Sequence, residues 1–253
     1  ISDISKDEHF SVKTNQGEFE CDSVVIATGG LSFAKIGATG FGYEMARKFG
    51  LKITQTRPSL VPLVFSGHSF TKLAGVSIDA LVSAGNRQFR ENILFTHRGL
   101  SGPAILQISN YWETGKDISI NLMPETDAAE ILLENRTGKQ NLDNFLGRYL
   151  PNRFAENFSP SKKPLNQLTN REIETVAAGL NDWRVAFRET EGYDKAEVTL
   201  GGVSTAELSS QTMESKKVSG LYFIGEVIDV TGWLGGYNFQ WAWSSGFVCG
   251  ENV

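Results

Sequence analysis

The sequence has 253 residues, of which 40% are hydrophobic and 21% charged, and its net charge is −5. This composition is ordinary for a folded globular protein and excludes a largely disordered chain. The negative net charge indicates no general field that would attract nucleic acid or an anionic membrane, so neither is expected as a partner. No apolar stretch approaches the roughly 20 residues of a membrane-spanning helix. No signal peptide is recognisable, and a cytoplasmic location is expected.

Residues 1–55 are predicted to begin an α/β domain. Residues 8–27 alternate apolar and polar positions around a turn at Asn15–Gly17, which is typical of a β-hairpin. The apolar run Val24–Ala27 is typical of a parallel strand buried on both faces. A helix is expected after Gly37–Gly42 and should end at Gly50.

Residues 56–123 should form a β-rich domain, with short strands at residues 60–65, 78–84 and 118–122. One short helix is expected there, with Ser101 as its cap and Pro103 in its first turn. Residues 124–182 are polar, and their apolar spacing predicts a helical insert with helices within residues 128–134, 142–150 and 172–180, and a loop at residues 159–164.

Strands are expected again at residues 183–187 and 196–200, so that residues 183–203 return to the β-rich domain. Residues 204–253 close the chain with a strand, a glycine-rich loop and a helix. This order suggests that one domain is inserted into another, with the two α/β ends meeting in space.

The closing segment carries the strongest functional signal. The apolar strand Leu221–Ile224 ends in Gly225-Glu226, and Gly235-Gly236 precede a helix expected to begin near Tyr237. Glycine lets the backbone approach a cofactor closely, and a carboxylate at a strand end can reach a ribityl hydroxyl of a flavin. A helix N-terminus offers free N–H groups and partial positive charge, which would stabilise negative charge on the pyrimidine edge of a reduced flavin. A tight turn before a packed helix is the simpler interpretation, but the clustering of glycines, acids and amides favours the flavin.

A second segment supports this interpretation. The strand that begins at Val24 ends in Ala27-Thr28-Gly29-Gly30. This resembles a motif of flavoproteins with two dinucleotide-binding domains, in which the strand end passes close to the FAD. This second motif is weak evidence by itself, because any buried strand can end in Thr-Gly, but together with the closing segment it is strong, since the two occur at the expected ends of the chain.

Together these stretches resemble a bacterial family of NAD(P)/FAD-dependent oxidoreductases that includes aminoacetone oxidases and bile-acid dehydro-reductases. The resemblance spans nearly the whole chain apart from the polar helical part. The matching stretches are residues 27–32, 37–40, 94–103, 197–203, 212–216 and 220–246.

The resemblance implies an α/β fold in which a Rossmann-like FAD domain is interrupted by a β-barrel-like domain that carries a helical insert. It implies hydride transfer between the flavin and an unidentified small organic substrate, with oxygen, NAD(P) or a quinone left open as the redox partner. The residues expected to face the cofactor are Thr28, Gly29, Gly30, Gly225, Glu226, Asp229, Gly235, Gly236, Tyr237, Asn238 and Gln240.

The catalytic group is left open by the sequence. The candidates are His97, in a glycine-rich loop before a helix, and Tyr237, beside Gly236. A loop histidine bonded to backbone is the simpler interpretation of His97, and His68 is expected on the surface. Trp243 is expected to pack in the core of its helix. No Cys or His spacing is that of a metal site, and no metal is expected.

The family begins with a G-x-G-x-x-G fingerprint that holds the FAD pyrophosphate, and this motif does not occur here. The sequence is therefore expected to be the C-terminal part of such a flavoprotein. One alternative is an inactive fragment that keeps a folded inserted module without FAD. A nicotinamide-only dehydrogenase is a further alternative, which no βαβ fingerprint supports.

Without the fingerprint, this chain alone is expected to bind FAD weakly or not at all. The measurement is an FAD titration of the purified chain, followed by its retained absorbance near 450 nm, roughly the oxidised-flavin band. Tight stoichiometric binding would contradict the expectation.

Overall fold

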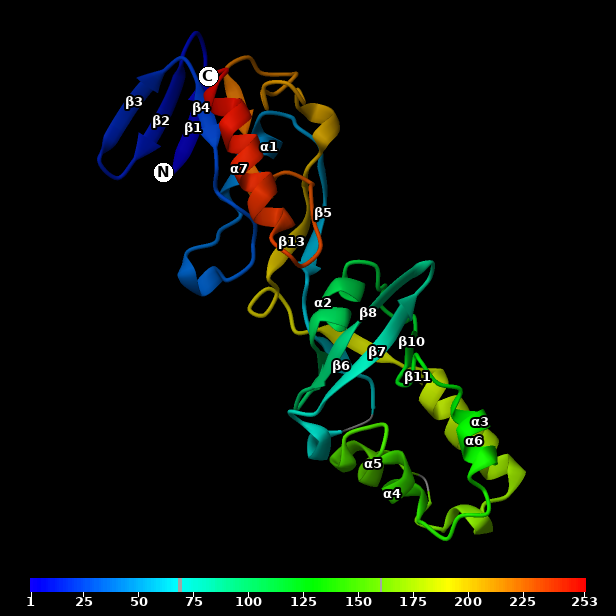
Figure 1. Ribbon diagram of the computed structural model, residues 1–253. Helices are drawn as coiled ribbons and strands as arrows, with labels where there is room; N and C mark the ends of the chain where they lie inside the picture. The colour runs from blue at the N-terminus through cyan, green and yellow to red at the C-terminus, as the bar shows by residue number, and fades with distance from the viewer. Residues whose placement is uncertain (68–69, 160) are drawn as a thin grey trace. The chain divides into compact units, whose positions relative to one another are not determined.

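The computed structural model describes residues 1–67, 70–159 and 161–253. His68 and Pro160, the latter within the expected 159–164 loop, lie outside the described residues. The chain divides into two compact units: unit 1 comprises residues 1–59 and 192–253, and unit 2 comprises residues 60–191 (Figure 1). In sequence, unit 2 is inserted between the two parts of unit 1. The fold is α/β, as predicted.

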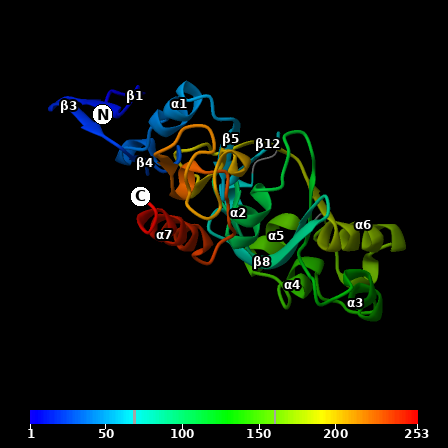
Figure 2. The same ribbon diagram turned by 90° about the horizontal axis from the view of Figure 1, so that it is seen from above.

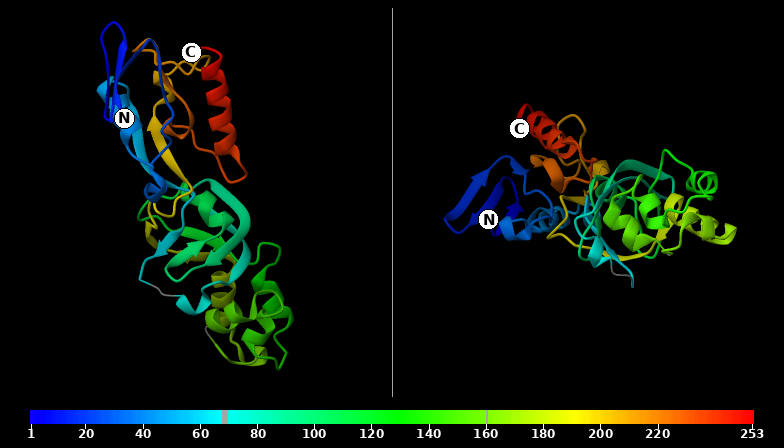
Figure 3. Two further views of the ribbon diagram at one scale, coloured as in Figure 1. Left: turned by 90° about the vertical axis from the view of Figure 1, so that its left-hand side faces the viewer. Right: turned by 60° about the horizontal axis from the view of Figure 1, so that its bottom comes forward.

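Unit 1 contains two strand pairs, a three-stranded meander and two α-helices (Figures 1 and 3). The strand pairs are β4 with β14, which is parallel, and β5 with β13, which is antiparallel. The predicted hairpin is confirmed as β2 and β3 of the meander. The elements are β1 (Asp3–Lys6), β2 (Phe10–Thr14), β3 (Gly17–Cys21), β4 (Val24–Ile26), α1 (Phe41–Lys48), β5 (Ile53–Ser59), β13 (Val198–Val203), β14 (Leu221–Phe223) and α7 (Tyr237–Gly250).

Close packing of α1 fixes the end of β4. Gly42 lies so near the strand that a Cβ there would be 2.3 Å from the hydroxyl oxygen of Thr28. A side chain at this position would therefore push the helix away from the strand. The predicted helix after Gly40 is confirmed, and Gly50 follows its end with φ of 74°.

Two expectations for unit 1 are wrong. The run at Val24–Ala27 was expected to be buried on both faces, but Val25 is 38% exposed, so no described element fully covers the face on which its side chain lies. Residues 192–203 were expected in the β-rich domain, but they belong to unit 1, because β13 pairs with β5 there.

Unit 2 is built on a seven-stranded antiparallel sheet in the order β11-β10-β7-β8-β9-β6-β12. Its two edge strands, β11 and β12, are consecutive pieces of chain separated only by Ala186. The sheet therefore curls until both of its ends belong to one stretch of chain, which is the barrel-like arrangement that was expected. The elements are β6 (Leu63–Phe65), β7 (Ser77–Ala84), β8 (Arg87–Phe95), β9 (Gly99–Ser101), α2 (Pro103–Ser109), β10 (Ile118–Asn121), α3 (Ala128–Glu134), α4 (Leu142–Leu146), α5 (Asn152–Phe158), α6 (Asn170–Asn181), β11 (Trp183–Val185) and β12 (Phe187–Thr190).

The helical insert is confirmed within unit 2. Helices α3 and α6 lie side by side in both Figure 1 and Figure 2, and α4 contacts α5. Helix α6 begins with a capping box, in which the Thr169 hydroxyl accepts from the backbone N–H of Glu172 and the Glu172 carboxylate accepts from that of Thr169. The helix expected over residues 142–150 is shorter, because the chain leaves α4 at Gly147.

The predicted cap of α2 is wrong. Ser101 belongs to β9, and the N-cap is Gly102, with φ of 89° and no side-chain hydrogen bond. A Cβ at Gly102 would lie 2.6 Å from the carbonyl oxygen of Asn92 in β8, so the tight approach of β8 decides the residue at this position. Pro103 is the first helical residue, as predicted. No helix among the described residues is long and apolar enough to cross a membrane.

Candidate functional site

The candidate site in unit 1 lies where two parallel strands end next to each other. In the register of β4 and β14, Ile26 is opposite Phe223, and the N–H of Ile224 donates to the Ile26 carbonyl at 3.1 Å. Beyond these residues the chain turns at Gly29 and Gly225, with φ of 71° and 72°. Ligands of open α/β sheets bind outside the carboxyl ends of parallel strands, which makes this edge the candidate site.

The two predicted segments meet at Gly30 and Glu226. A Cβ at Gly30 would lie 2.2 Å from Oε1 of Glu226 and 2.4 Å from the hydroxyl oxygen of Thr199. Only glycine therefore lets the turn after β4 lie against the carboxylate that follows β14. The structure thus brings together residues that the sequence places at opposite ends of the chain.

Thr199 in β13 is a residue of the site that the sequence analysis did not assign. Its backbone N–H donates to Oε1 of Glu226 at 2.8 Å, and its hydroxyl accepts from the N–H of Leu31 at 2.7 Å. The hydroxyl of Thr231 in turn donates to the Thr199 carbonyl at 3.3 Å. Thr199 therefore connects the turn after β4 with the loop after β14. Its only signal in the sequence was its place inside the matching stretch of residues 197–203.

The carboxyl of Glu226 has an altered proton affinity. Burial raises its pKa above the usual range, while the hydrogen bonds from Thr199 act in the opposite direction. Tyr43 lies close by, and burial together with the negative charges of Glu226 and Asp229 raises the pKa of its phenol. Asp229 is positioned by its backbone N–H, which donates to the Val203 carbonyl at 2.9 Å.

The start of α7 is open. Its N-cap is Gly236, with φ of 88°, and no side chain caps the helix. Apart from Gly236 itself and its two neighbours in the chain, no heavy atom of the described residues lies within 4 Å of the place where a Gly236 Cβ would be. The first N–H groups of α7 are thus available to an anionic or carbonyl group.

Helix α7 is tied to the turn after β14. The indole N–H of Trp241 donates to the Gly225 carbonyl at 3.1 Å, and the N–H of Gly225 donates to the Ser245 hydroxyl at 2.9 Å. Both partners lie on α7, so the helix and the glycine turn keep a fixed geometry. Trp243 was expected to pack in the core, but it is 73% exposed.

Two predicted cofactor residues bond to the chain itself. The amide oxygen of Asn238 accepts from the N–H of Gly232 at 2.8 Å, and its NH₂ donates to the Gly232 carbonyl at 3.3 Å. The Gln240 amide donates to the Ser244 hydroxyl at 3.1 Å. Asn238 therefore closes the loop before α7. A role of either amide toward a cofactor stays a prediction.

The two catalytic candidates lie in different units. Tyr237, the first residue of α7, is 62% exposed in unit 1. His97 lies in unit 2, in an exposed turn between β8 and β9. In unit 1, the hydroxyls of Ser32 and Tyr43 are buried and have no hydrogen-bond partner among the described residues. A buried polar atom without a protein partner is costly, and a ligand or water molecule would satisfy it.

The parallel strand pair and the glycine turns at its carboxyl end are typical of a Rossmann-type fold. The family model described as "HI0933-like protein Rossmann domain" matches residues 1–252, so the chain belongs to the HI0933-like family.

Three relatives are similar to this chain along nearly its whole length. The chain is 49% identical over 264 residues to the ribosomal RNA dihydrouridine synthase of Escherichia coli and 41% identical to that of Haemophilus influenzae, each alignment covering 100% of this chain and 66% of the relative. It is 30% identical over 266 residues to the 3-dehydro-bile acid delta(4,6)-reductase of Clostridium scindens, and this alignment covers 96% of this chain and 64% of the relative. The chain thus spans about two thirds of the length of these relatives. At the level of the fold, the predicted Rossmann-like domain is confirmed.

We expect Glu226→Gln to remove a pH dependence of stability. The folded-state pKa of Glu226 is raised above its ordinary value of 4.5, so the folded protein binds this proton more tightly than the unfolded chain. The free energy of unfolding contributed by Glu226 therefore falls as pH rises from 4.5 through the folded pKa and is constant above it. Glutamine is neutral throughout and should abolish this fall.

The measurement is the thermal midpoint of each protein across about pH 4 to 8. Glu20→Gln, which replaces an exposed glutamate of β3, is the matched control and should keep the wild-type profile. Identical profiles for Glu226→Gln and the wild type would show that Glu226 does not titrate abnormally.

We expect Gly236→Val in the complete protein to lower flavin content by more than about half, because valine would occupy the open space at the start of α7. Valine is also strained at a φ of 88°, so the control must carry the same strain. Gly50, with φ of 74° and equally open surroundings, provides it as Gly50→Val. Absorbance of the purified proteins gives the flavin-to-protein ratio. Equal ratios for both variants and the wild type would contradict the assignment of α7.

Proposed function

We propose that the complete protein is an FAD-dependent reductase that adds hydrogen across a carbon–carbon double bond conjugated to a carbonyl, and that its substrate is a uridine of ribosomal RNA. The similarity to two ribosomal RNA dihydrouridine synthases along the whole chain carries this proposal. The names of the relatives describe related chemistry, which strengthens it. In uracil, the C5–C6 double bond is conjugated to the C4 carbonyl. In a 3-dehydro-bile acid with delta-4,6 unsaturation, the double bonds are conjugated to the C3 carbonyl.

Both reductions need the same two components. A hydride adds to the carbon farther from the carbonyl, and a proton adds to the carbon next to it. For uridine, the hydride goes to C6 and the proton to C5, which gives dihydrouridine and an oxidised cofactor. A site for such chemistry must therefore hold a hydride donor, stabilise the negative charge that develops and supply one proton.

The residues of unit 1 fit an FAD. The open space beside Gly29 and Gly236 admits a flat group close to the backbone, and the buried hydroxyls of Ser32 and Tyr43 lack protein partners among the described residues. When bound, reduced FAD supplies the hydride. The uncapped N-terminus of α7 favours the negative charge of the reduced pyrimidine edge, and the contacts of Trp241 and Ser245 with Gly225 keep this helix in place.

The carboxylate of Glu226 and the phenol of Tyr237 have separate tasks in this proposal. Glu226, held by Thr199 beside Gly30, binds a ribityl hydroxyl of the cofactor. Tyr237 carries an exposed O–H at the open start of α7 and holds the proton for the substrate. The reducing equivalents come from NAD(P)H, and the protein works in the cytoplasm; both statements are part of the proposal.

An RNA substrate departs from the expectation of a small molecule and no nucleic acid, which rested on the net charge and stays untested. A small-molecule reductase is the second candidate, because the Clostridium scindens relative acts on a bile acid. Its lower identity of 30%, against 49% and 41%, makes it the weaker guide.

The test uses the complete protein, loaded with FAD and reduced without oxygen. It is offered ribosomal RNA from cells that lack the corresponding gene, and separately a steroid with a 3-keto-4-ene group. We expect one uridine of the RNA to gain two hydrogens, as detected by mass spectrometry of nuclease digests, and the steroid to remain unchanged. Reduction of the steroid without any dihydrouridine in the RNA would replace the proposal with the second candidate.

A further inference from the structure

The charge of unit 2 is unevenly distributed along the chain. Residues 135–171 carry seven Lys or Arg side chains and two carboxylates, although the net charge of the chain is −5. All seven basic side chains are exposed. We call these residues the basic surface: Arg136, Lys139, Arg148, Arg153, Lys162, Lys163 and Arg171.

Backbone contacts bring several of these side chains onto adjoining segments. The N–H of Leu165 donates to the Gln140 carbonyl at 3.0 Å, and that of Leu142 donates to the Lys163 carbonyl at 3.1 Å. The segment before α4, with Lys139, therefore runs beside the segment before α6, with Lys163. The guanidinium of Arg148 donates to the amide oxygen of Gln140 and so belongs to the same region.

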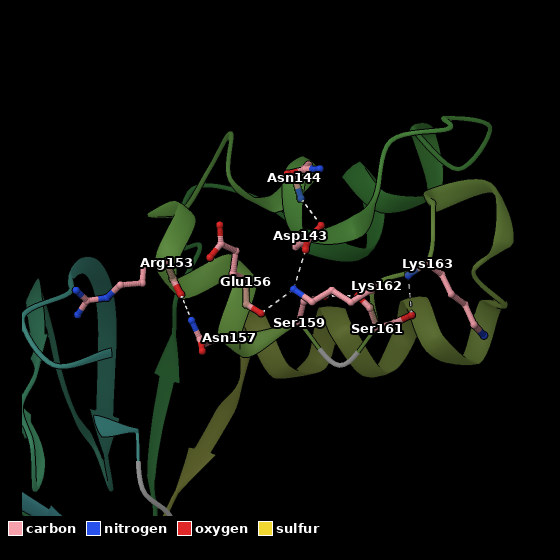
Figure 4. A network of polar contacts seen from close by, with 9 residues as sticks. All are labelled: Asp143, Asn144, Arg153, Glu156, Asn157, Ser159, Ser161, Lys162 and Lys163. Carbon is pink, nitrogen blue, oxygen red and sulfur yellow. Dashed lines mark hydrogen bonds and ion pairs between the residues drawn. The ribbon is translucent and has the colours of Figure 1, made fainter. Parts of the chain in front are cut away.

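Few carboxylates compensate this charge. Lys162 pairs with Asp143 at 2.8 Å and also donates to the Glu156 carbonyl (Figure 4), and Lys163 pairs with Glu172 at 2.7 Å. The hydrogen bond from Lys162 lowers the pKa of Asp143, so this carboxyl stays ionised. Among the described residues, no carboxylate lies within 4.0 Å of the other five basic groups.

The side chains of Arg148 and Arg153 have neutral partners. Arg148 lies over the ring of Phe145, with 5.4 Å from the guanidinium carbon to the ring centroid, and Arg153 donates to the Ala74 carbonyl. Such contacts orient a guanidinium and leave its charge available to a phosphate. In Figure 4, Arg153 lies on α5, and Lys162 and Lys163 lie on the segment that follows it; the side chains of Arg153 and Lys163 point away from each other, and Asn144 and Asn157 lie nearby.

We propose that the basic surface is the docking site for the phosphate backbone of the RNA substrate, and this identity of the partner rests on the proposed function. Neutralising phosphates releases condensed counterions, which gives affinity without reading sequence. The exposed amides supply hydrogen bonds to phosphate and ribose, and Tyr149, which is 46% exposed beside Arg148, offers a ring for base stacking.

RNA suits this surface better than an anionic membrane does. A peripheral membrane site usually inserts apolar side chains among its basic ones. Within the described part of residues 135–171, Tyr149 is the one large hydrophobic side chain that is strongly exposed, and the leucines of α4 and its neighbours are buried. The surface therefore offers charge, amides and one amphipathic ring, but no apolar anchor.

The test measures RNA affinity of the complete, FAD-loaded protein. The probe is a fluorescently labelled single-stranded fragment of ribosomal RNA, titrated by anisotropy at increasing KCl. The variant is Lys139→Gln/Arg148→Gln/Lys163→Gln. The matched control removes three exposed charges of unit 1, as Lys13→Gln/Arg47→Gln/Lys52→Gln. Thermal midpoints and flavin content of both variants report on folding.

We expect the surface variant to bind the probe at least about tenfold more weakly than wild type at 0.1 M salt, roughly the loss for a few phosphate contacts. The slope of log affinity against log salt should shrink by about 2, since each single-strand contact contributes about 0.7. The control should keep the wild-type slope. A folded surface variant with unchanged affinity and slope would overturn the docking proposal, even where the wild type makes dihydrouridine.

Two further outcomes separate this inference from the proposed function. A wild-type protein that reduces ribosomal uridine, with surface and control variants equally weakened in binding, would overturn the docking surface alone. Loss of binding to phosphatidylglycerol vesicles, with RNA affinity unchanged, would overturn it in favour of a membrane. Failure of the proposed function would be recorded independently, as absence of dihydrouridine in the digest.

Discussion

The parallel pairing of β4 with β14 is the constraint on which the candidate site depends. It joins residues 24–26 to residues 221–223, with the whole of unit 2 between them in sequence. The entropic penalty of closing so long a connection grows only slowly with its length. A second pairing, of β5 with β13, places Ser59 opposite Val198, so the chain leaves unit 1 and returns to it at neighbouring positions. An inserted unit is therefore compatible with the strand ends on which the site is built.

Once the strand ends are adjacent, a small number of contacts determines the geometry of the candidate site. Gly30 has no Cβ, and Glu226 therefore approaches the turn after β4 closely enough to accept from Thr199. Burial raises the pKa of this carboxyl, while the hydrogen bonds from Thr199 that hold it in place act in the opposite direction. On the other side of Gly225, Trp241 and Ser245 fix α7 with its first N–H groups uncovered. A preorganised dipole of this kind needs no rearrangement when charge develops near it.

The sequence predicted these features to different extents, for physical reasons. The hairpin of β2 and β3, the helix after Gly40 and the strand–glycine–acid order of the closing segment were predictable, because each depends on local turn chemistry and periodicity. The N-cap of α2 was not, because the approach of β8 to Gly102 is a tertiary contact. Thr199 was missed for the same reason: its role arises from two partners that are distant in sequence, Leu31 and Glu226. The exposure of Trp243 was not predictable either, because a largely apolar helix has no polar face that would indicate which side is exposed.

The prediction that nucleic acid is not a partner rested on the net charge alone and stays a prediction. A net charge averages over the whole chain, whereas a polyanion responds to the field of the surface it meets. In this protein the average is negative while residues 135–171 are strongly basic, and the acidic remainder is unfavourable to phosphate. If RNA docks as proposed, attraction at the basic surface and repulsion elsewhere would favour a single orientation of the RNA. A negative net charge is therefore compatible with an RNA substrate, because RNA binding depends on the local excess of basic residues at the surface that contacts the RNA.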